Sequence, residues 1–212
     1  MNGRLSQTRP PRMRARNDLW VLGAVMAGVV LSFNPLQAAA QCSNPKMMAS
    51  KPNLYYRNNS DGTVDDLRTG LTWDRCVWGL TNATCTGGET SLHTWAQALT
   101  IPEQANLEVY KNASNWRLPS VKELESLTET CRSTPAINTL LFPSTPANII
   151  WTGSPSLQDA ALAWTVQFAE GKVLPAARDG RFAVRLVRDT DGTPVRVPPP
   201  PPSPTPAAEA AP

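Results

Sequence analysis

The chain has 212 residues, enough for one ordinary domain with extensions or for two small domains. Its formal charge of +3 is uneven, because the first 40 residues hold five arginines and a single acid. The remainder carries 15 basic and 16 acidic groups, which excludes a long-range positive field of the kind that attracts nucleic acid. The single histidine, His93, excludes metal sites that need two histidines, such as HExxH.

The N-terminus has the pattern of an export signal. Residues 1–18 are polar and basic, and an apolar run of 15 residues follows, from Leu19 to Phe33. A membrane-spanning helix needs about 20 apolar residues, so the run fits a signal peptide better. The small residues Ala38, Ala39 and Ala40 then provide a cleavage site. We predict a signal peptide over residues 1–40, and an uncleaved membrane anchor is the alternative.

Export changes how the four cysteines are interpreted. Cys42, Cys76, Cys85 and Cys131 all follow the predicted cleavage site, and no pair has the CxxC spacing of a zinc knuckle. In an oxidising compartment an even number of cysteines favours disulfides over metal ligands, so no metal or cofactor is predicted. Of the three connectivities we favour Cys76–Cys85, which closes a short loop, together with Cys42–Cys131. The second bond would tie an N-terminal extension, residues 41–52, to the domain.

The C-terminus, residues 189–212, is rich in proline. Nine of the 21 prolines lie at or beyond Pro194, and five of them are consecutive, from Pro198 to Pro202. Proline donates no backbone hydrogen bond and favours an extended polyproline II conformation, so this segment cannot form a core. We predict a disordered tail that acts as a spacer, and the alternative is a ligand for a partner that recognises proline.

Residues 53–188 remain and are long enough for a single core. Turn residues separate three short strands, which gives successive hairpins over residues 54–57, 63–66 and 71–73. Later alternating segments predict four further strands, over residues 149–152, 163–168, 171–173 and 182–188. In the last of these, Phe182, Val184 and Leu186 share one face, and Arg185 lies on the other.

Two capping boxes predict the helices. Thr94 and Gln97 form a T-x-x-Q box, and the helix that follows is expected to run until Pro102. Ser120 and Glu123 form an S-x-x-E box, and this second helix is expected to end near Thr130. In that helix the acids, including Glu129, are expected to face away from the core or to lie near its N-terminal end. The order of the predicted elements along the chain, strands followed by two helices and then further strands, predicts an α+β single domain with a largely antiparallel, twisted sheet.

Few residues stand out as functional candidates. Asp61, Asp65 and Asp66 lack the spacing of an EF-hand loop, so turn and corner roles are favoured over Ca²⁺ binding. Trp78 lies in the polar loop between Cys76 and Cys85 and is the tryptophan best placed to stack on a sugar.

A cluster of arginines, Arg178 and Arg181 with Arg185 and Arg188, offers groups for sulfate or carboxylate, with a solvated edge as the alternative. No hydrolase, kinase or phosphate-binding motif is present, and no catalytic residue is assigned.

The domain resembles a known bacterial family, named for the C-terminal domain of a collagen-like adhesin (the Lcl C-terminal domain). The most specific matching blocks are NWRLPSVKELESL at residues 115–127 and DGTVDDLRTGLTW at residues 61–73, and other blocks follow in the family's order. The resemblance implies a C-type-lectin-like fold and a location outside the cytoplasm. The adhesin binds sulfated polysaccharides, but no motif assigns that binding to residues of this chain, which also lacks the collagen-like repeat.

Together these features predict an exported, non-catalytic binding module in the periplasm, on the cell surface or secreted. The expected partner is a glycan or an envelope protein, not nucleic acid, and the membrane only if residues 19–33 are retained. The alternative is a structural or protein-interaction domain with a Pro-rich spacer. An uncharacterised enzyme using His93 is a third hypothesis.

Overall fold

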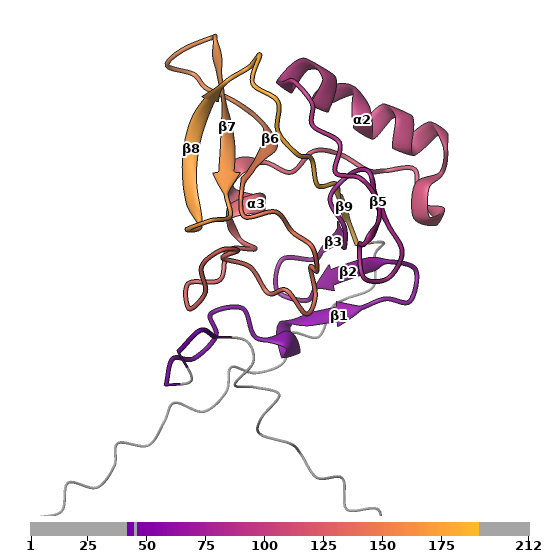
Figure 1. Cartoon of the computed structure of the whole chain (residues 1–212). Helices are drawn as coiled ribbons and strands as arrows, with labels where there is room; N and C mark the ends of the chain where they lie inside the picture. Colours follow the sequence, from indigo (N-terminus) through magenta and orange to yellow (C-terminus); the bar gives the residue numbers. More distant parts are fainter. Residues whose placement is uncertain (1–41, 45, 191–212) are drawn as a thin grey trace, which may run out of the picture. The chain divides into compact units, whose positions relative to one another are not determined.

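The computed structural model describes residues 42–44 and 46–190 (Figure 1). The predicted signal peptide and residues 191–212 of the predicted tail lie outside the described residues. Within the described part of the chain, no helix is long and apolar enough to cross a membrane. The order of the elements confirms the α+β class.

A four-stranded antiparallel sheet forms from both ends of the domain, in the order β1-β2-β3-β9. Its strands are β1 (Tyr56–Asn58), β2 (Thr63–Asp66), β3 (Leu71–Asp74) and β9 (Val187–Asp189). The predicted hairpins are confirmed, although the first strand starts two residues later than expected because η1 (Asn53–Tyr55) is a 3-10 turn.

A separate three-stranded antiparallel sheet contains β6 (Ile149–Pro155), β7 (Leu162–Gln167) and β8 (Lys172–Ala177), drawn in orange in Figure 1. In a small ribbon, β4 (Leu80–Thr81) of the Cys76–Cys85 loop pairs with β5 (Gly87–Gly88), which follows Cys85. The described strands therefore form three sheets, whereas the sequence predicted one.

The strand predicted over residues 182–188 is not continuous, which explains why the strands divide into separate sheets. Only its end forms a regular strand, β9, while Phe182 and Ala183 make isolated bridges to His93 and Ile150. Arg185 is fully buried and bonds to backbone carbonyls rather than lying on an outer strand face. The segment thus crosses between the two larger sheets instead of extending one of them.

Both capping boxes are present. The first opens α2 (Trp95–Leu107), which continues past Pro102, so the expectation that it would stop there was wrong. Pro102 removes one backbone hydrogen-bond donor from the helix. However, Ala98 and Ile101 before it and Ala105 after it are all buried in the core. Packing on both sides of the proline keeps the helix continuous, since tertiary contacts supply most helix stability in proteins.

The second box opens α3 (Val121–Glu125), which ends five residues before the predicted Thr130. The chain leaves the helix because Thr128 pairs with Ile137, and the Glu129 N–H donates to the Ala136 carbonyl at 2.9 Å. The expectation that Glu129 faces away from the core was also wrong, since it is 1% exposed.

The Glu129 carboxylate joins the N-terminal extension to the domain. It accepts the backbone N–H groups of Ser50 at 2.9 Å and Lys51 at 2.7 Å, and the Ser50 hydroxyl at 2.8 Å. Burial would raise the pKa of Glu129, but the backbone N–H groups of Cys131, Ser50 and Lys51 outweigh it and lower the pKa. The disulfide Cys42–Cys131 closes the same contact covalently.

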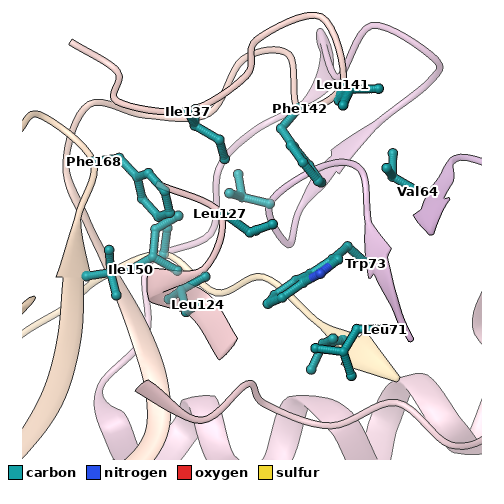
Figure 2. Packing of buried hydrophobic residues seen from close by; sticks show 14 of the residues in the cluster. Val64, Leu71, Trp73, Leu124, Leu127, Ile137, Leu141, Phe142, Ile150 and Phe168 are labelled. Atoms are coloured by element: carbon teal, nitrogen blue, oxygen red, sulfur yellow. The ribbon is translucent and has the colours of Figure 1, made fainter. Parts of the chain in front are cut away.

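Two hydrophobic clusters form the core. In the first, Trp73 of β3 lies among side chains from α3 and the segment before β6, including Leu124 and Phe142 (Figure 2). The second joins Trp116 and Trp151 to the inner face of α2. The described fold continues to Thr190, beyond the predicted boundary at residue 188, because the Thr190 N–H donates to the Gly70 carbonyl at 3.0 Å.

Candidate functional site

A hollow of about 590 Å³ lies where three segments meet, and its size is typical of small-ligand sites. One wall is the turn after β1, the second belongs to the Cys76–Cys85 loop, and the third is the turn after α2. Most of its lining residues have polar side chains, and the lining comprises Asn58, Asn59, Ser60, Asp61, Gly62, Arg75, Cys76, Leu80, Thr81, Asn82, Ala83, Tyr110 and Lys111.

An ion pair holds two of these walls together. The Nζ of Lys111 donates to Oδ1 of Asp74 at 2.6 Å and to the Gly62 carbonyl at 2.7 Å. The Asp74 side chain is 1% exposed, and the same oxygen accepts the Cys76 N–H at 3.0 Å. Burial raises the pKa of the Tyr110 hydroxyl, and the charge of Asp74 and a hydrogen bond to it add to the effect. The tyrosine therefore remains a neutral donor.

The wall formed by the turn after α2 has an unusual backbone. Val109, Lys111 and Asn112 have φ values of 50°, 50° and 57°, in the left-handed region that non-glycine residues seldom adopt. Each such residue costs about 1–2 kcal/mol, most for a β-branched side chain such as Val109. The Lys111 bonds and the Trp116 Nε1–H, which donates to the Tyr110 carbonyl at 2.7 Å, hold the turn. Strain maintained in this way is characteristic of binding sites.

Trp78, the predicted sugar-stacking residue, lies beside this wall. Its ring packs edge-on against Tyr110 with centroids 5.3 Å apart, and its backbone N–H donates to the Val184 carbonyl at 2.7 Å. Trp78 is half-buried and packs against the second core cluster, so most of its ring supports Tyr110. Its Nε1–H is not used in any hydrogen bond within the described residues.

Arg178 and Arg181, the predicted anion ligands, have other partners. The Arg178 guanidinium lies 4.3 Å from the centre of the Trp95 ring and donates to the Leu162 carbonyl at 3.1 Å. Arg181 donates weakly to the Leu92 carbonyl at 3.4 Å and lines a pocket of about 240 Å³. Neither arginine lines the hollow beside Tyr110, so the structure does not bring the three candidates into one site.

Arg185 also departs from expectation. Its Nη1 donates to the carbonyls of Asp74 at 2.7 Å and Arg75 at 2.6 Å, and its Nη2 donates to the Thr145 hydroxyl at 2.7 Å. Complete burial lowers its pKa to about 10, against the opposing charge of Asp74. Arg185 therefore fixes the end of β3 beneath the hollow and is unavailable to a ligand.

The acids near the hollow have structural partners. Asp65 pairs with Arg57 at 2.6 Å and accepts the Thr72 hydroxyl at 2.7 Å. Asp61 accepts the Thr63 N–H at 2.9 Å, and Asp66 accepts the Arg68 N–H at 2.9 Å, so both stabilise turns. Among residues 42–44 and 46–190, no three His, Cys, Asp or Glu side chains gather as metal ligands would.

His93 lies in a backbone pairing with Phe182. Its backbone pairs with Phe182 in both directions, and its buried Nε2 lacks a hydrogen bond. Burial lowers the pKa of His93, and the nearby charge of Arg181 lowers it further.

Sequence reasoning missed most of the lining. Asn58 and Ser60 were interpreted only as turn residues, while Tyr110 and Lys111 lie in a segment where no element was predicted. The run of asparagines from Asn58 was the one available signal, because asparagine-rich turns carry exposed donors and acceptors. The left-handed turn that presents Lys111 contains no glycine, and Asn112 is its only residue of a type that favours this conformation.

Comparison with known proteins gives the same family as the sequence blocks. No curated protein matches the chain significantly. Residues 62–188, more than half of the chain, match the family described as the Lcl C-terminal domain. This range contains two of the three walls of the hollow and the buried Asp74 between them. The chain therefore belongs to the Lcl C-terminal domain family.

Proposed function

We propose that the protein is an exported, non-catalytic binding module whose ligand, a glycan or another envelope component, occupies the hollow beside Tyr110. The observation that carries the proposal is the lining itself. Three segments distant in sequence converge there and present amide and hydroxyl groups around an aromatic side chain. Clefts with a few convergent polar groups are the usual sites of small-ligand recognition.

The disulfides support a location outside the cytoplasm. Cys42–Cys131 and Cys76–Cys85 use all four cysteines of the chain. Such bonds persist in oxidising compartments and are rare in the cytosol. The basic, then apolar N-terminal sequence is consistent with export to the periplasm, the cell surface or the medium.

The surroundings of the titratable groups favour binding over catalysis. A general base must reach the proton that it abstracts, and the Nε2 of His93 is buried away from the surface. The carboxylates of Asp65 and Asp74 form ion pairs with Arg57 and Lys111. These ion pairs stabilise the fold around the hollow.

A glycan array probed with the exported protein tests the proposal. We expect binding to a restricted set of glycans, and we expect the signal to disappear when Tyr110, a lining residue, is replaced by alanine. An array without any bound glycan, combined with recovery of one specific envelope protein in a pull-down, would overturn the glycan assignment. That result would favour the alternative, a protein-interaction domain whose Pro-rich segment serves as a spacer.

A further inference from the structure

We propose a second ligand site, separate from the hollow beside Tyr110, in the pocket of about 240 Å³ beside Arg181. Its ligand is a small carboxylic acid that carries one compact apolar group. Three features of the pocket support this assignment: apolar walls, an arginine that no carboxylate pairs with, and a lining without acidic residues. The site does not depend on the function proposed for the hollow, because the two linings share no residue.

Apolar side chains form most of the lining. Leu92 lies before α2, Pro146 and Ile149 lie around the start of β6, and Phe182 and Ala183 belong to the segment between β8 and β9. Leu92 is 48% exposed, and Ile149 and Phe182 are half-buried. Three segments distant in sequence therefore bring apolar groups together at the surface. A ligand with an apolar group gains free energy by covering them, because it removes their area from water.

The chain around the pocket is held in place. The Phe182 N–H donates to the His93 carbonyl at 3.0 Å, and the His93 N–H donates back at 2.9 Å. The Trp151 N–H donates to the Ala183 carbonyl at 3.0 Å, and the Trp151 and Phe182 rings pack with centroids 4.9 Å apart. Gly180 leaves room for the Phe182 ring, since a Cβ there would lie 2.9 Å from it. A pocket that is already formed loses little conformational entropy when a ligand binds.

Arg181 gives the pocket a positive charge. Within the described residues its guanidinium makes one long hydrogen bond, from Nη2 to the Leu92 carbonyl at 3.4 Å, and no ion pair. No Asp or Glu lines the pocket, so no acid of the lining competes with a ligand for this charge. An arginine recognises a carboxylate through two parallel, charge-assisted hydrogen bonds, and the N–H groups of Arg181 are available to form them.

Two neutral residues of the lining also favour a ligand that accepts hydrogen bonds. The Oδ1 of Asn148 accepts the Ile149 N–H at 2.8 Å, which leaves its amide NH₂ as a donor. The Thr90 hydroxyl lines the pocket and makes no hydrogen bond within the described chain. Together with Arg181 these groups offer more donors than acceptors. An ionised carboxylate only accepts, so it matches them, whereas an ammonium group only donates and does not.

The size of the pocket limits the rest of the ligand. Its volume of about 240 Å³ is less than half that of the hollow, about 590 Å³. Sites for drug-sized ligands measure about 300–1,000 Å³. The pocket therefore suits a single phenyl ring or a short acyl chain rather than an oligosaccharide, and the two sites take different ligands.

NMR titration of the exported, ¹⁵N-labelled protein with four matched probes tests the proposal. Phenylacetate combines the ring with the carboxylate, phenylacetamide lacks the charge, phenethylamine reverses it, and acetate lacks the ring. We expect phenylacetate to bind at least about tenfold more tightly than each of the others, because both apolar burial and the charge-assisted pair contribute. Equal affinity for phenylacetate and phenylacetamide, or no binding of phenylacetate, would overturn the proposal.

Two substitutions at exposed positions keep the test independent of folding. R181Q should weaken phenylacetate binding about tenfold or more and leave phenylacetamide binding unchanged. L92S should weaken both probes, because it removes an apolar wall. The control is K172Q, which removes an exposed cation that is paired with Glu170 and lies outside the lining. Full affinity for phenylacetate in R181Q, or an equal loss in K172Q, would overturn the assignment of Arg181.

His93 provides a second readout, because it is the only histidine of the chain. Burial lowers the pKa of His93, and the charge of Arg181 lowers it further. A carboxylate bound to Arg181 offsets that charge, so the pKa should rise when phenylacetate saturates the site and should not respond to phenylacetamide. An NMR pH titration of the imidazole in the untagged protein measures this change. An unchanged pKa with phenylacetate bound would place the acid away from Arg181 and contradict the proposal.

Discussion

The ammonium group of Lys111 and the carboxylate of Asp74 lie 2.6 Å apart although they come from unrelated parts of the fold. Asp74 ends β3 of the four-stranded sheet, whereas Lys111 is part of the left-handed turn after α2. The Nζ of Lys111 also donates to the Gly62 carbonyl in the opposite wall at 2.7 Å. Lys111 therefore contributes both to the stability of the domain and to the position of two walls of the hollow.

Replacing Lys111 should therefore damage both stability and binding. In K111M the carboxylate of Asp74 stays buried without its cation, which costs about 3 kcal/mol of unfolding free energy. Urea denaturation followed by tryptophan fluorescence measures this loss. The matched control is K122M, whose lysine is 84% exposed in an ion pair with Glu125 and should cost under about 0.5 kcal/mol. Equal effects of the two substitutions would show that the Asp74 contact is unimportant.

The buried guanidinium of Arg185 should be essential to the fold. Substitution by methionine leaves the carbonyls of Asp74 and Arg75 and the Thr145 hydroxyl without their donor. Several orphaned buried groups should together cost about 3 kcal/mol or more. Thermal unfolding of R185M compared with K172M, which removes an exposed cation paired with Glu170, checks this prediction. A melting temperature for R185M close to that of K172M would contradict it.

Glu129 should make the domain less stable in acid. Its folded-state pKa lies below the ordinary value of 4.5, so the folded protein binds fewer protons than the unfolded chain. The resulting stability is fully present above pH 4.5 and is lost as the pH falls through the lower, folded-state value.

The variant E129Q isolates this effect, because glutamine keeps the shape of the side chain but does not titrate. Wild type should be more stable than E129Q at pH 7, and the difference should shrink at a second, acidic pH at which the carboxylate becomes protonated. Denaturant midpoints at the two pH values provide the measurement. A difference that stayed constant with pH would mean that the charge of Glu129 is not what holds the N-terminal extension.

The two disulfides should have separate roles. Cys42 and Cys131 are 89 residues apart, so removing their bond should cost about 4.5 kcal/mol by the loop-entropy relation. Cys76 and Cys85 are nine residues apart, and the corresponding cost is about 2.5 kcal/mol. The paired serine variants C42S/C131S and C76S/C85S can be compared by denaturation and by ligand titration.

The two disulfide variants should rank in the opposite order for loss of ligand affinity. The Cys76–Cys85 loop forms one wall of the hollow, whereas Cys42 and Cys131 line none of it. Loss of affinity should therefore be greater in C76S/C85S, the variant that loses less stability. The reverse ranking for affinity would place the ligand near the N-terminal extension.

Local signals in the sequence were sufficient to locate the helices and most strands, but not to predict how the strands pair into sheets. The capping boxes at Thr94 and Ser120 located both helices, since cap hydrogen bonds are made within four residues. The prediction from alternating polar and apolar residues was wrong at Arg185, because such alternation assumes a continuous strand. It cannot reveal that this charged side chain points inward and donates to carbonyls at the end of β3. Contacts between residues distant in sequence, such as Arg185 with Asp74 and Lys111 with Asp74, determine both the division into sheets and the position of the hollow.

Amide chemical-shift mapping of the exported, ¹⁵N-labelled protein tests the central claim, that the hollow beside Tyr110 is the ligand site. The probe is a pool of neutral and sulfated oligosaccharides. We expect the largest shifts in the lining segments 58–62, 80–83 and 110–111, together with the indole N–H of Trp78. No shifts in those segments, or shifts centred on Leu92 and Arg181 around the smaller pocket, would contradict the account.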